Sequence, residues 1–306
     1  MKTLLITGVA GFIGRYVARY FSSRKWRVVG TDNSQPENAP LADLYHYQRL
    51  QLPDPEFDIL LQNYHPDVLI HCAGRASVAL SVTDPVADFY GNTLLTFHIL
   101  NALRLNAPTC RFIFLSSAAV YGNPAKLPIA ETHPTSPISP YGFHKLQSEQ
   151  LCLEFARIYA QPTASVRIFS AYGAGLRRQV MWDICQKAIS QKHLVLQGTG
   201  NESRDFIHAL DIARALEIIA SHAPMEGEVY NLGSGAEIKI SDLAHMLLEK
   251  LNLDIVTEFD GSRVSGNPLN WQADITKLES LGFSLSISLD KGTQLFANWV
   301  TAELIQ

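Results

Sequence analysis

The chain has 306 residues, of which 47% are hydrophobic and 18% are charged, and its formal net charge is −4. This composition is typical of a globular protein and excludes an intrinsically disordered chain. The sequence contains no run of Lys or Arg, so it lacks the positive charge by which proteins bind nucleic acid or an anionic membrane. We therefore expect a small-molecule ligand, no nucleic acid and no membrane.

Apolar segments alternate with amphipathic ones through the first half of the chain. The apolar segments, which are short and typical of buried strands, lie at 3–7, 27–32, 67–73, 111–117 and 165–169. The amphipathic segments, which are typical of helices, include 12–21 and 87–103. Continuous apolar strands separated by helices predict βαβ units and a parallel sheet covered on both faces. The sequence therefore predicts a doubly wound, Rossmann-like α/β fold.

Three glycines follow the first predicted strand. Gly8, Gly11 and Gly14 lie in TGVAGFIG, where this strand turns into the first helix. Glycine permits the tight turn, the approach of backbone N–H groups to a pyrophosphate, and close packing of the helix on the strand. A tight turn without a ligand is the alternative explanation.

Asp32 ends the second predicted strand and favours the ligand hypothesis. A carboxylate at this position accepts hydrogen bonds from the ribose hydroxyls of an adenosine and repels a 2′-phosphate. The residues after it, NSQPEN, include no Arg or Lys that would bind such a phosphate, and we expect Arg15 on the outer face of the first helix. The glycines and Asp32 together predict a site for NAD rather than NADP.

Ser116 and Ser117 end the predicted strand at 111–117. They would therefore lie at the carboxyl edge of the sheet, where open α/β folds bind their ligands. At that edge, the Ser117 hydroxyl can share a hydrogen bond with a substrate oxygen.

The stretch SPYGFHK at 139–145 places a tyrosine and a lysine four residues apart. Ser139 is suited to cap a helix and Pro140 to its first turn, so Tyr141 and Lys145 would share one helical face. Free tyrosine has a pKa of about 10, and a neighbouring ammonium favours the phenolate that a base near neutral pH requires. In isolation an exposed helix face is the better explanation of the pair, but the glycine turn, the acidic strand end and the serine strand end favour an acid/base site.

The sequence changes in character after Phe169. Loops rich in Gly, Asn and Ser, such as QGTGNESRD and GSRVSGNPLN, separate shorter elements. We expect a dinucleotide-binding domain over 1–169 and a smaller, partly interleaved α/β substrate lobe over 170–306, with segments near 206–233 returning to the first domain.

The cysteines bear on the cellular compartment. The four of them lie far apart, without a Cys-x-x-Cys pair or a His spacing typical of zinc, so a reducing compartment is favoured and no metal site is expected. The apolar segment at 3–7 is too short for a signal or membrane segment. We expect a cytoplasmic protein.

The joint order of these motifs resembles that of the extended short-chain dehydrogenases/reductases, the nucleotide-sugar epimerase/dehydratase family. The matching segments run along nearly the whole chain, at 7–14, 66–74, 116–122, 141–145, 204–213, 231–235 and 273–283. The resemblance implies that Ser117, Tyr141 and Lys145 are catalytic. It implies further cofactor contacts from Phe12, Ile13, Asn33, Leu52, His71, Ala73, Gly74, Asn92, Ser116, Tyr141 and Lys145.

The resemblance also implies that the second lobe binds a nucleoside diphosphate sugar. Arg204 resembles a diphosphate contact, because arginine grips phosphate oxygens with two N–H groups. Arg263 resembles a second contact, although the Arg-Pro-Gly-Asp signature of the family appears here as RVSGN. Ser170 stands where many relatives carry an asparagine that touches the sugar. Further expected substrate contacts are Arg75, Ser117, Arg177 and Gln179. A solvated helix start would explain Arg177 and Gln179 equally well.

Ala118 and Ala119 bear on the type of reaction. Family dehydratases resemble one another in an Asp-Glu pair at this place, because eliminating water needs an extra acid and base. The alanines argue against a dehydratase. They leave a 4-epimerase, which oxidises C4 to a ketone and returns the hydride to the opposite face.

Two alternatives remain beside the epimerase. One is an NAD(P)H-dependent reductase of a nucleoside-diphosphate 4-keto-6-deoxyhexose, because HCAGRASV and SVTDP resemble segments of such reductases. The other is a dinucleotide-binding sensor without catalysis, against which the intact Ser117, Tyr141 and Lys145 argue.

The resemblance finally implies a homodimer. In relatives, the helix with the Tyr and Lys and the helix before it form a four-helix bundle with their copies. Apolar residues with suitable spacing are Phe89, Leu94, Phe97, Leu151 and Phe155, although ordinary core packing would explain them as well.

Overall fold

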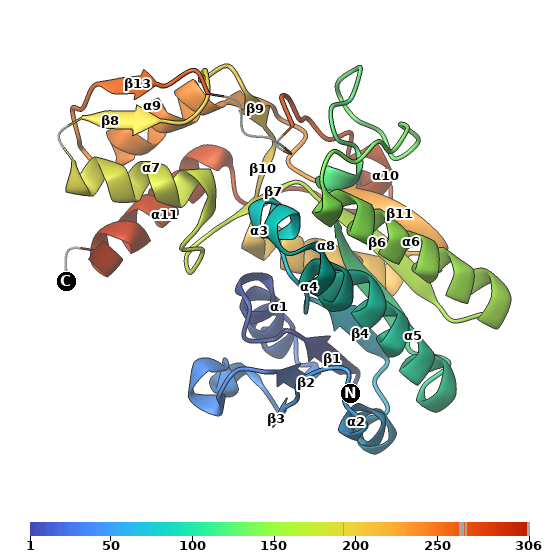
Figure 1. Cartoon of the computed structure of the whole chain (residues 1–306). Coiled ribbons are helices and arrows are strands. Elements are labelled where there is room, and N and C mark those ends of the chain that lie inside the picture. The colour runs from blue at the N-terminus through green and yellow to red at the C-terminus, as the bar shows by residue number, and fades with distance from the viewer. Residues whose placement is uncertain (192, 263–265, 267, 305–306) are drawn as a thin grey trace.

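The structure, a computed structural model, describes residues 1–191, 193–262, 266 and 268–304. Its centre is a seven-stranded sheet in the order β11-β6-β5-β4-β1-β2-β3, in which every neighbouring pair is parallel (Figure 1). The strands are β1 (Thr3–Thr7), β2 (Arg27–Asp32), β3 (His46–Arg49), β4 (Val68–His71), β5 (Arg111–Ser117), β6 (Thr163–Ile168) and β11 (Glu226–Leu232). The predicted doubly wound parallel sheet is confirmed.

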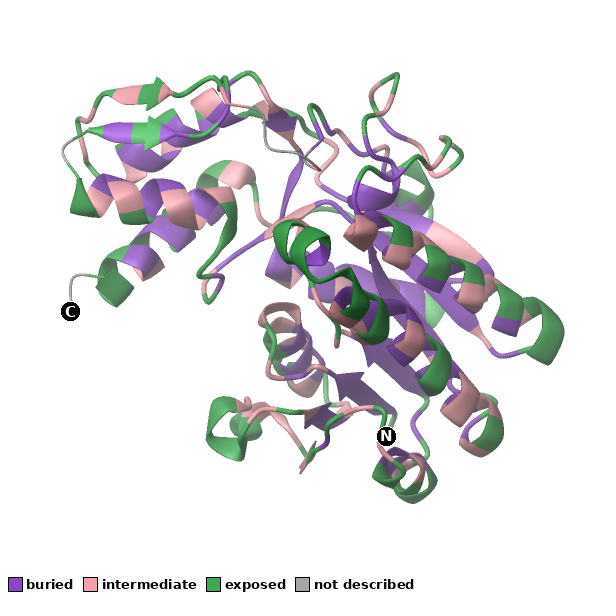
Figure 2. Cartoon of the chain, in the orientation of Figure 1, coloured by how far each residue is buried: buried purple, intermediate pink, exposed green. Residues whose placement is uncertain are grey.

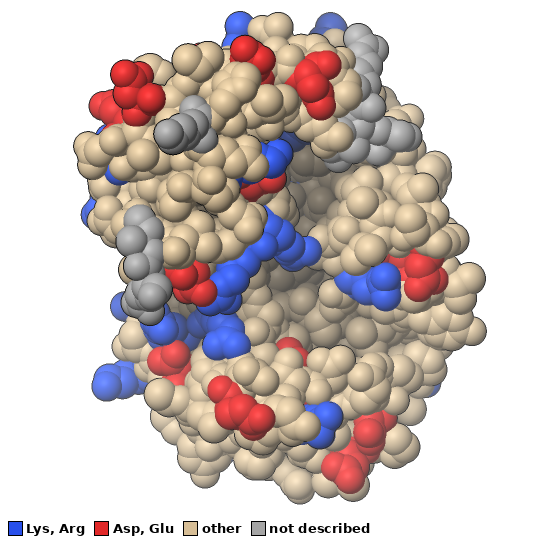
Figure 3. All heavy atoms as spheres, turned by 60° about the vertical axis from the view of Figure 1, so that its left-hand side comes forward, with Lys and Arg blue, Asp and Glu red and all other residues tan. Residues whose placement is uncertain are grey.

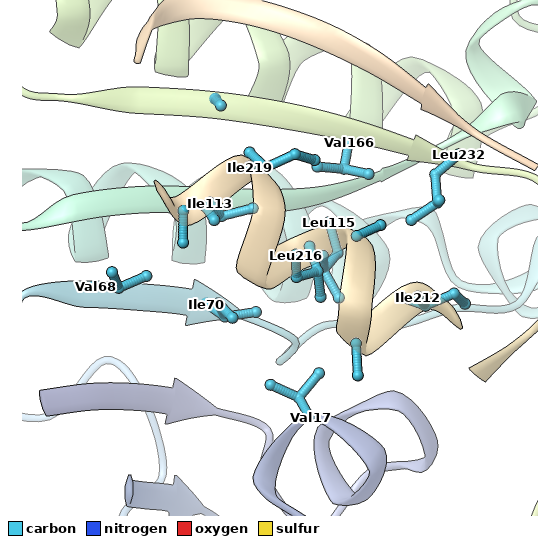
Figure 4. Close-up of a cluster of buried hydrophobic side chains, with 14 of the residues drawn as sticks. Val17, Val68, Ile70, Ile113, Leu115, Val166, Ile212, Leu216, Ile219 and Leu232 are labelled. Carbon is cyan, nitrogen blue, oxygen red and sulfur yellow. The ribbon is translucent and has the colours of Figure 1, made fainter. Parts of the chain in front are cut away.

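Helices cover both faces of this sheet. One face packs against α1 (Phe12–Ser23) and α8 (Ala209–His222). Figure 4 shows Ile212, Leu216 and Ile219 of α8 facing the strands of this side. The other face packs against α2 (Glu56–Tyr64), α5 (Leu95–Asn106) and α6 (Pro140–Tyr159). Because both faces are covered, the central strands β1, β4 and β5 are buried along nearly their whole length (Figure 2), which explains their apolar sequences.

Short helical segments lead from β4 into α5. They are α3 (Val78–Thr83), α4 (Pro85–Phe89) and a π-helical turn at Tyr90–Leu94. The predicted helix at 87–103 is therefore interrupted by one wide turn, of a kind often found at functional sites. Further one-turn helices lie at Pro36–Asn38, Leu41–Asp43 and Ala118–Val120.

The second lobe has its own apolar core. Its three strand pairs are β7 (Ser170–Tyr172) with β10 (Phe206–His208), β8 (Leu194–Leu196) with β13 (Thr257–Phe259), and β9 (Ser203–Arg204) with β12 (Ile238–Lys239). Helices α7 (Gln179–Ser190), α9 (Ile240–Lys250) and α11 (Leu289–Leu304) pack around this core, whereas α10 (Thr276–Glu279) packs against β11 of the main sheet. Met181, Leu247 and Phe296 lie at the centre of that core. After β10 the chain returns to the main sheet through α8 and β11, while the exact domain limits expected from the sequence stay a prediction.

The strand order places the candidate residues together. The chain runs outward from β1 through β2 and β3, and in the other direction through β4 and β5. Loops therefore diverge at the carboxyl ends of β1 and β4, where doubly wound folds bind ligands. Gly8, Asp32, His71 and Ser117 all lie at this edge. No helix in the described part of the chain is long and apolar enough to cross a membrane.

Candidate active site

The glycine turn after β1 forms a cradle without side chains. Gly8 has φ 71°, and a Cβ atom on it would lie 2.5 Å from the backbone nitrogen of Ala73. A Cβ on Gly14 would collide with the carbonyl of Gly8. Gly11 precedes α1 without a side-chain cap, so the first N–H groups of the helix are open to an acceptor. The cradle fits a pyrophosphate.

The carboxylate of Asp32 lies beside this cradle. It accepts hydrogen bonds from the backbone N–H groups of Ala10 at 3.1 Å and Ser34 at 2.9 Å. Arg15 is exposed on α1, as expected, but its guanidinium donates to the carbonyls of Ala10 and Asn38 and so lies across the loops next to Asp32. Long side chains reach back over loops in ways that helical periodicity does not predict.

Other expected cofactor residues surround the cradle. Phe12 packs edge-on against Tyr16, and Ile13 packs against the core beneath α1. Asn33 is exposed and donates to Gln51, while Leu52 packs against the core on the other side of the sheet.

His71 lies under the site and is fully buried. Its Nδ1 atom lies 2.7 Å from the hydroxyl of Thr7. Burial and the charge of Lys145 lower the pKa of His71 to about 3, so the ring is neutral. It joins β4 to β1 at the point where their loops diverge.

Asn92 holds the turn that follows β4. It is buried in the π-helical turn and donates from Nδ2 to the carbonyl of Arg75 at 3.1 Å. Its Oδ1 atom is buried and has no hydrogen-bond partner in the described chain. A Cβ atom on Gly74 would lie 2.8 Å from that oxygen, so glycine is required there. This amide oxygen therefore keeps an unused acceptor position beside Gly74.

The cap predicted for the helix at 139–145 is confirmed. Ser139 caps α6 by accepting from the N–H of Gly142 at 3.2 Å, and Pro140 is its first residue. The first turns of α6 therefore hold Tyr141 and Lys145 at the carboxyl edge of the sheet. Lys145 is buried, whereas Tyr141 is partly buried.

The pKa of the Tyr141 phenol differs from the sequence-based expectation. Burial raises this pKa, a hydrogen bond with Ser117 and the charge of Arg178 lower it, and the charge of Asp88 raises it. The net direction is upward. The Lys145 ammonium lies 5.8 Å from the centre of the Tyr141 ring and donates instead to the carbonyl of Leu115 at 2.9 Å.

The two serines at the end of β5 face opposite sides of the sheet. Ser117 is directed to Tyr141, whereas Ser116 is buried and donates to Glu149 at 2.5 Å. Glu149 in turn binds Arg167 at 2.7 Å. Ser116 therefore belongs to a buried network that joins β5, β6 and α6.

A cavity of about 580 Å³ lies between the second lobe and the segments of the first half that hold Asn123 and Ile138. Its polar lining includes Asn123, Asp183, Gln197, Glu202, Arg204 and Ser262. Arg204 donates to the carbonyls of Ser203 and Leu269 and lies over the ring of Trp271, and burial lowers its pKa to about 10. Figure 3 shows a hollow between the two halves that is bordered on one side by Lys and Arg side chains.

The remaining expected substrate residues lie in different places. Arg75 lies against Gly91, and its buried Nε atom has no partner within the described ranges. Ser170 starts β7 and donates its N–H to the carbonyl of Asp205. Gln179 is the exposed first residue of α7. Arg263 lies outside the described residues.

Arg177 and its neighbour Arg178 point to different sides. Arg177 binds Glu303 at 2.6 Å and lies over Trp299, within the second lobe. Arg178 donates to the carbonyl of Ala76 at 2.6 Å, across the gap between the halves, and acts on the Tyr141 phenol. The structure therefore brings Arg178 to the site and leaves Arg177 outside it.

Sequence reasoning missed Asp88 and His144, which pair beside Lys145. One signal for Asp88 exists in the sequence. Asp88, Asn92 and Thr96 recur every four residues within the amphipathic segment, and all three are buried. A polar stripe on the inner face of a helix indicates a site or a buried network rather than a solvated surface.

Comparisons with known proteins agree with this geometry. A model of the family described as "NAD dependent epimerase/dehydratase family" matches residues 4–233. A UDP-glucose 4-epimerase of Halalkalibacterium halodurans is 28% identical over 91% of this chain and 89% of its own. A GDP-6-deoxy-D-mannose reductase of Pseudomonas aeruginosa is 29% identical over 93% and 96%, respectively. The structure of a UDP-glucuronic acid 4-epimerase from Bacillus cereus, with UDP-glucuronic acid and NAD, superposes with TM-score 0.89 and 26% identity over 98% of this chain and 99% of that one.

Proposed function

This chain belongs to the NAD dependent epimerase/dehydratase family, and from that premise we propose that it is an NAD-dependent 4-epimerase of a nucleoside diphosphate sugar. The observation that carries the proposal is the convergence of Ser117, Tyr141 and Lys145 beside the glycine cradle. Ala118 and Ala119, both buried, provide no acid or base for dehydration. Relatives that act on UDP-sugars support the substrate class.

The glycine cradle, Asp32 and the unpartnered Oδ1 atom of Asn92 fit a dinucleotide. A bound dinucleotide would accept the hydride from the sugar and return it. Tyr141 removes the proton from the C4 hydroxyl of the sugar and gives a proton back in the reverse step. Ser117 hydrogen-bonds the same oxygen and holds it in line with the phenol. Lys145 holds an ammonium 5.8 Å from the centre of the Tyr141 ring, and in this proposal its positive charge opposes the increase in the phenol pKa that burial causes.

The second lobe holds the nucleotide in this proposal. Arg204 lines the cavity with guanidinium N–H groups suited to phosphate oxygens. Burial also weakens the competition of water for the Arg204 guanidinium, so a phosphate there would be bound more tightly than at an exposed arginine.

The reductase alternative has one specific observation in its favour. The relative from Pseudomonas aeruginosa is a GDP-6-deoxy-D-mannose reductase with nearly the same identity as the 4-epimerase relative. A reductase would use the same Tyr141 as the proton donor to a 4-keto sugar. It would differ in needing fresh reduced cofactor for every turnover.

One assay separates these possibilities. The purified protein is incubated with a panel of UDP-, dTDP-, GDP- and CDP-sugars, and the configuration at C4 is followed by NMR without added cofactor. Inversion at C4, together with NAD released by denaturation in equal amount to the protein, is the expected result. Consumption of NADPH with a 4-keto sugar would instead identify a reductase, and neither activity would favour the sensor.

Exposed aromatic residues support the homodimer as part of the proposal. Phe89 and Phe97, on the α4–α5 segment, are 39% and 40% exposed. Leu94 and Leu151 are half-buried, while Phe155 is buried in the core and does not contribute a surface. Two copies joined through this face would bury the aromatic side chains.

The proposed cellular location is the cytoplasm, and the proposed role is carbohydrate biosynthesis. All four cysteines lack disulfide partners, which supports the cytoplasm, where nucleotide sugars enter carbohydrate biosynthesis.

A further inference from the structure

A buried hydrogen-bonded pair of side chains joins α4 to the helix that carries Tyr141 and Lys145. Asp88 is fully buried, and its Oδ2 atom lies 2.6 Å from Nδ1 of His144. An ionised carboxylate only accepts hydrogen bonds, so Nδ1 of His144 carries a proton and donates. Phe89 packs edge-on against the His144 ring, with 5.5 Å between the ring centres. His144 directly precedes Lys145 in α6, so this pair holds the Asp88 carboxylate against the turn of α6 that carries Lys145.

The second oxygen of Asp88 is buried and has no hydrogen-bond partner among the residues that the structure describes. A buried carboxylate is costly unless positive charge lies close to it. Lys145 meets this need: α4 packs against α6, Asp88 contacts the residue next to Lys145, and Asp88 is the largest of the charges that raise the pKa of Lys145. Burial, the dominant influence, lowers the pKa of Lys145 to about 8. Without Asp88 the ammonium would lose its proton at still lower pH.

The other ionisable groups around Lys145 and Tyr141 are compensated or neutral. Glu149 is bound by Arg167 and Ser116. The thiols of Cys72 and Cys152 have their pKa raised to about 12 by burial, and burial keeps His71 neutral. Arg178 acts on Tyr141 from the other half of the molecule. Asp88 is thus the one carboxylate acting on Lys145 that no arginine binds within the described chain.

We propose that Asp88, held by His144, is a positioning residue whose negative charge keeps the proton on Lys145 beside Tyr141. The role of this charge in the reaction rests on the proposed function. The charge state itself is a property of the folded protein and is measurable without substrate.

The variant Asp88→Asn tests this proposal, because an Asn side chain still accepts the hydrogen bond from His144 but carries no charge. Asp88 raises the pKa of both Lys145 and Tyr141. In a bell-shaped profile of kcat/KM against pH, ionisation of Tyr141 sets the acid limb and loss of the Lys145 proton sets the alkaline limb. Loss of the Asp88 charge should therefore move both limbs to lower pH. We expect a shift on the order of half a pH unit or more in each limb.

Asp84→Asn is the matched control. Asp84 is an exposed carboxylate at the start of the same α4 helix, where it caps the N–H of Ala87 at 3.0 Å. Asparagine caps a helix about as well as aspartate, so this change should leave both limbs in place. Asp88→Ser is the second charge-removing variant, should Asp88→Asn fold poorly, and it must show the same direction of shift.

A second readout needs no substrate. The Lys145 ammonium is titrated by NMR of the protein with 13C-labelled lysine, with Lys145→Met to assign its signal, and the Tyr141 phenol by ultraviolet difference absorption against Tyr141→Phe. Both titrations should move to lower pH in Asp88→Asn. A loss of activity at every pH, with unmoved limbs and unmoved titrations, would overturn the inference and leave Asp88 a structural residue. Moved titrations in a protein that epimerises no sugar would refute the proposed function alone.

Discussion

The ammonium of Lys145 donates a hydrogen bond to the carbonyl oxygen of Leu115 at 2.9 Å, and this bond ties α6 to β5 two residues before Ser117. The Tyr and Lys of α6 are thereby fixed relative to the serine of β5, although about thirty positions separate the two elements in the chain. The relative position of Ser117 and Tyr141 thus depends on a buried side chain rather than on a loop.

Replacement of Tyr141 by Phe should remove the proton carrier and leave the ring packing intact. We expect the rate of C4 inversion to fall on the order of a hundredfold to ten-thousandfold, which is the usual contribution of general acid–base catalysis. The amount of NAD released by denaturation should not change. Tyr159→Phe, at the exposed end of the same helix, is the control. Full activity of Tyr141→Phe would contradict the mechanism.

Burial of Lys145 should be visible in the pH dependence of stability. Its pKa is lowered from 10.5 to about 8, so between these values the unfolded chain binds a proton that the folded chain does not. The free energy of unfolding should therefore rise with pH in this window, by up to about 3 kcal/mol from this group. Urea unfolding of the native protein and of Lys145→Met at both ends of the window measures the difference, with the exposed Lys291→Met as control. Parallel pH dependences of native and Lys145→Met proteins would refute the prediction.

Arg178→Gln should change the pH profile, whereas Arg177→Gln should not. The charge of Arg178 lowers the pKa of Tyr141, so its removal should move the acid limb of kcat/KM to higher pH. Because Arg178 is exposed, salt should weaken this effect in the native protein. Arg177 binds Glu303 instead, and its replacement serves as the matched comparison. A shift of the acid limb with Arg177→Gln alone would favour the assignment made from the sequence.

The homodimer proposal predicts the effect of a charge on the exposed aromatic face. Phe97→Asp should place a carboxylate within the proposed interface and convert the dimer to a monomer, since a buried unpaired charge is strongly destabilising. Light scattering after size exclusion measures the mass of both forms. Leu295→Asp, at a similarly exposed site on α11, should leave the mass unchanged. A native protein that runs as a monomer at micromolar concentration would rule the proposal out.

The sequence by itself determined the features that follow from local backbone preference and side-chain periodicity. The strands at 3–7, 27–32 and 111–117 have the bounds that their apolar patterns predict, because burial on both faces favours apolar residues at successive positions in the middle of each strand. The cap of Ser139 and the glycine turn at Gly8 were predictable for a similar reason, since each depends on a few adjacent residues.

Tertiary structure decided which side chains meet and how well water reaches them. Asp88 and His144 pair although they are 56 positions apart in the chain. Arg178 contacts the carbonyl of Ala76 in the first half of the chain, whereas its neighbour Arg177 binds Glu303. The raised pKa of Tyr141 and the lowered pKa of Lys145 arise mainly from burial, which no local pattern encodes. Local rules fix the elements because their energies act over a few residues, whereas charge and desolvation depend on everything that packs around a group.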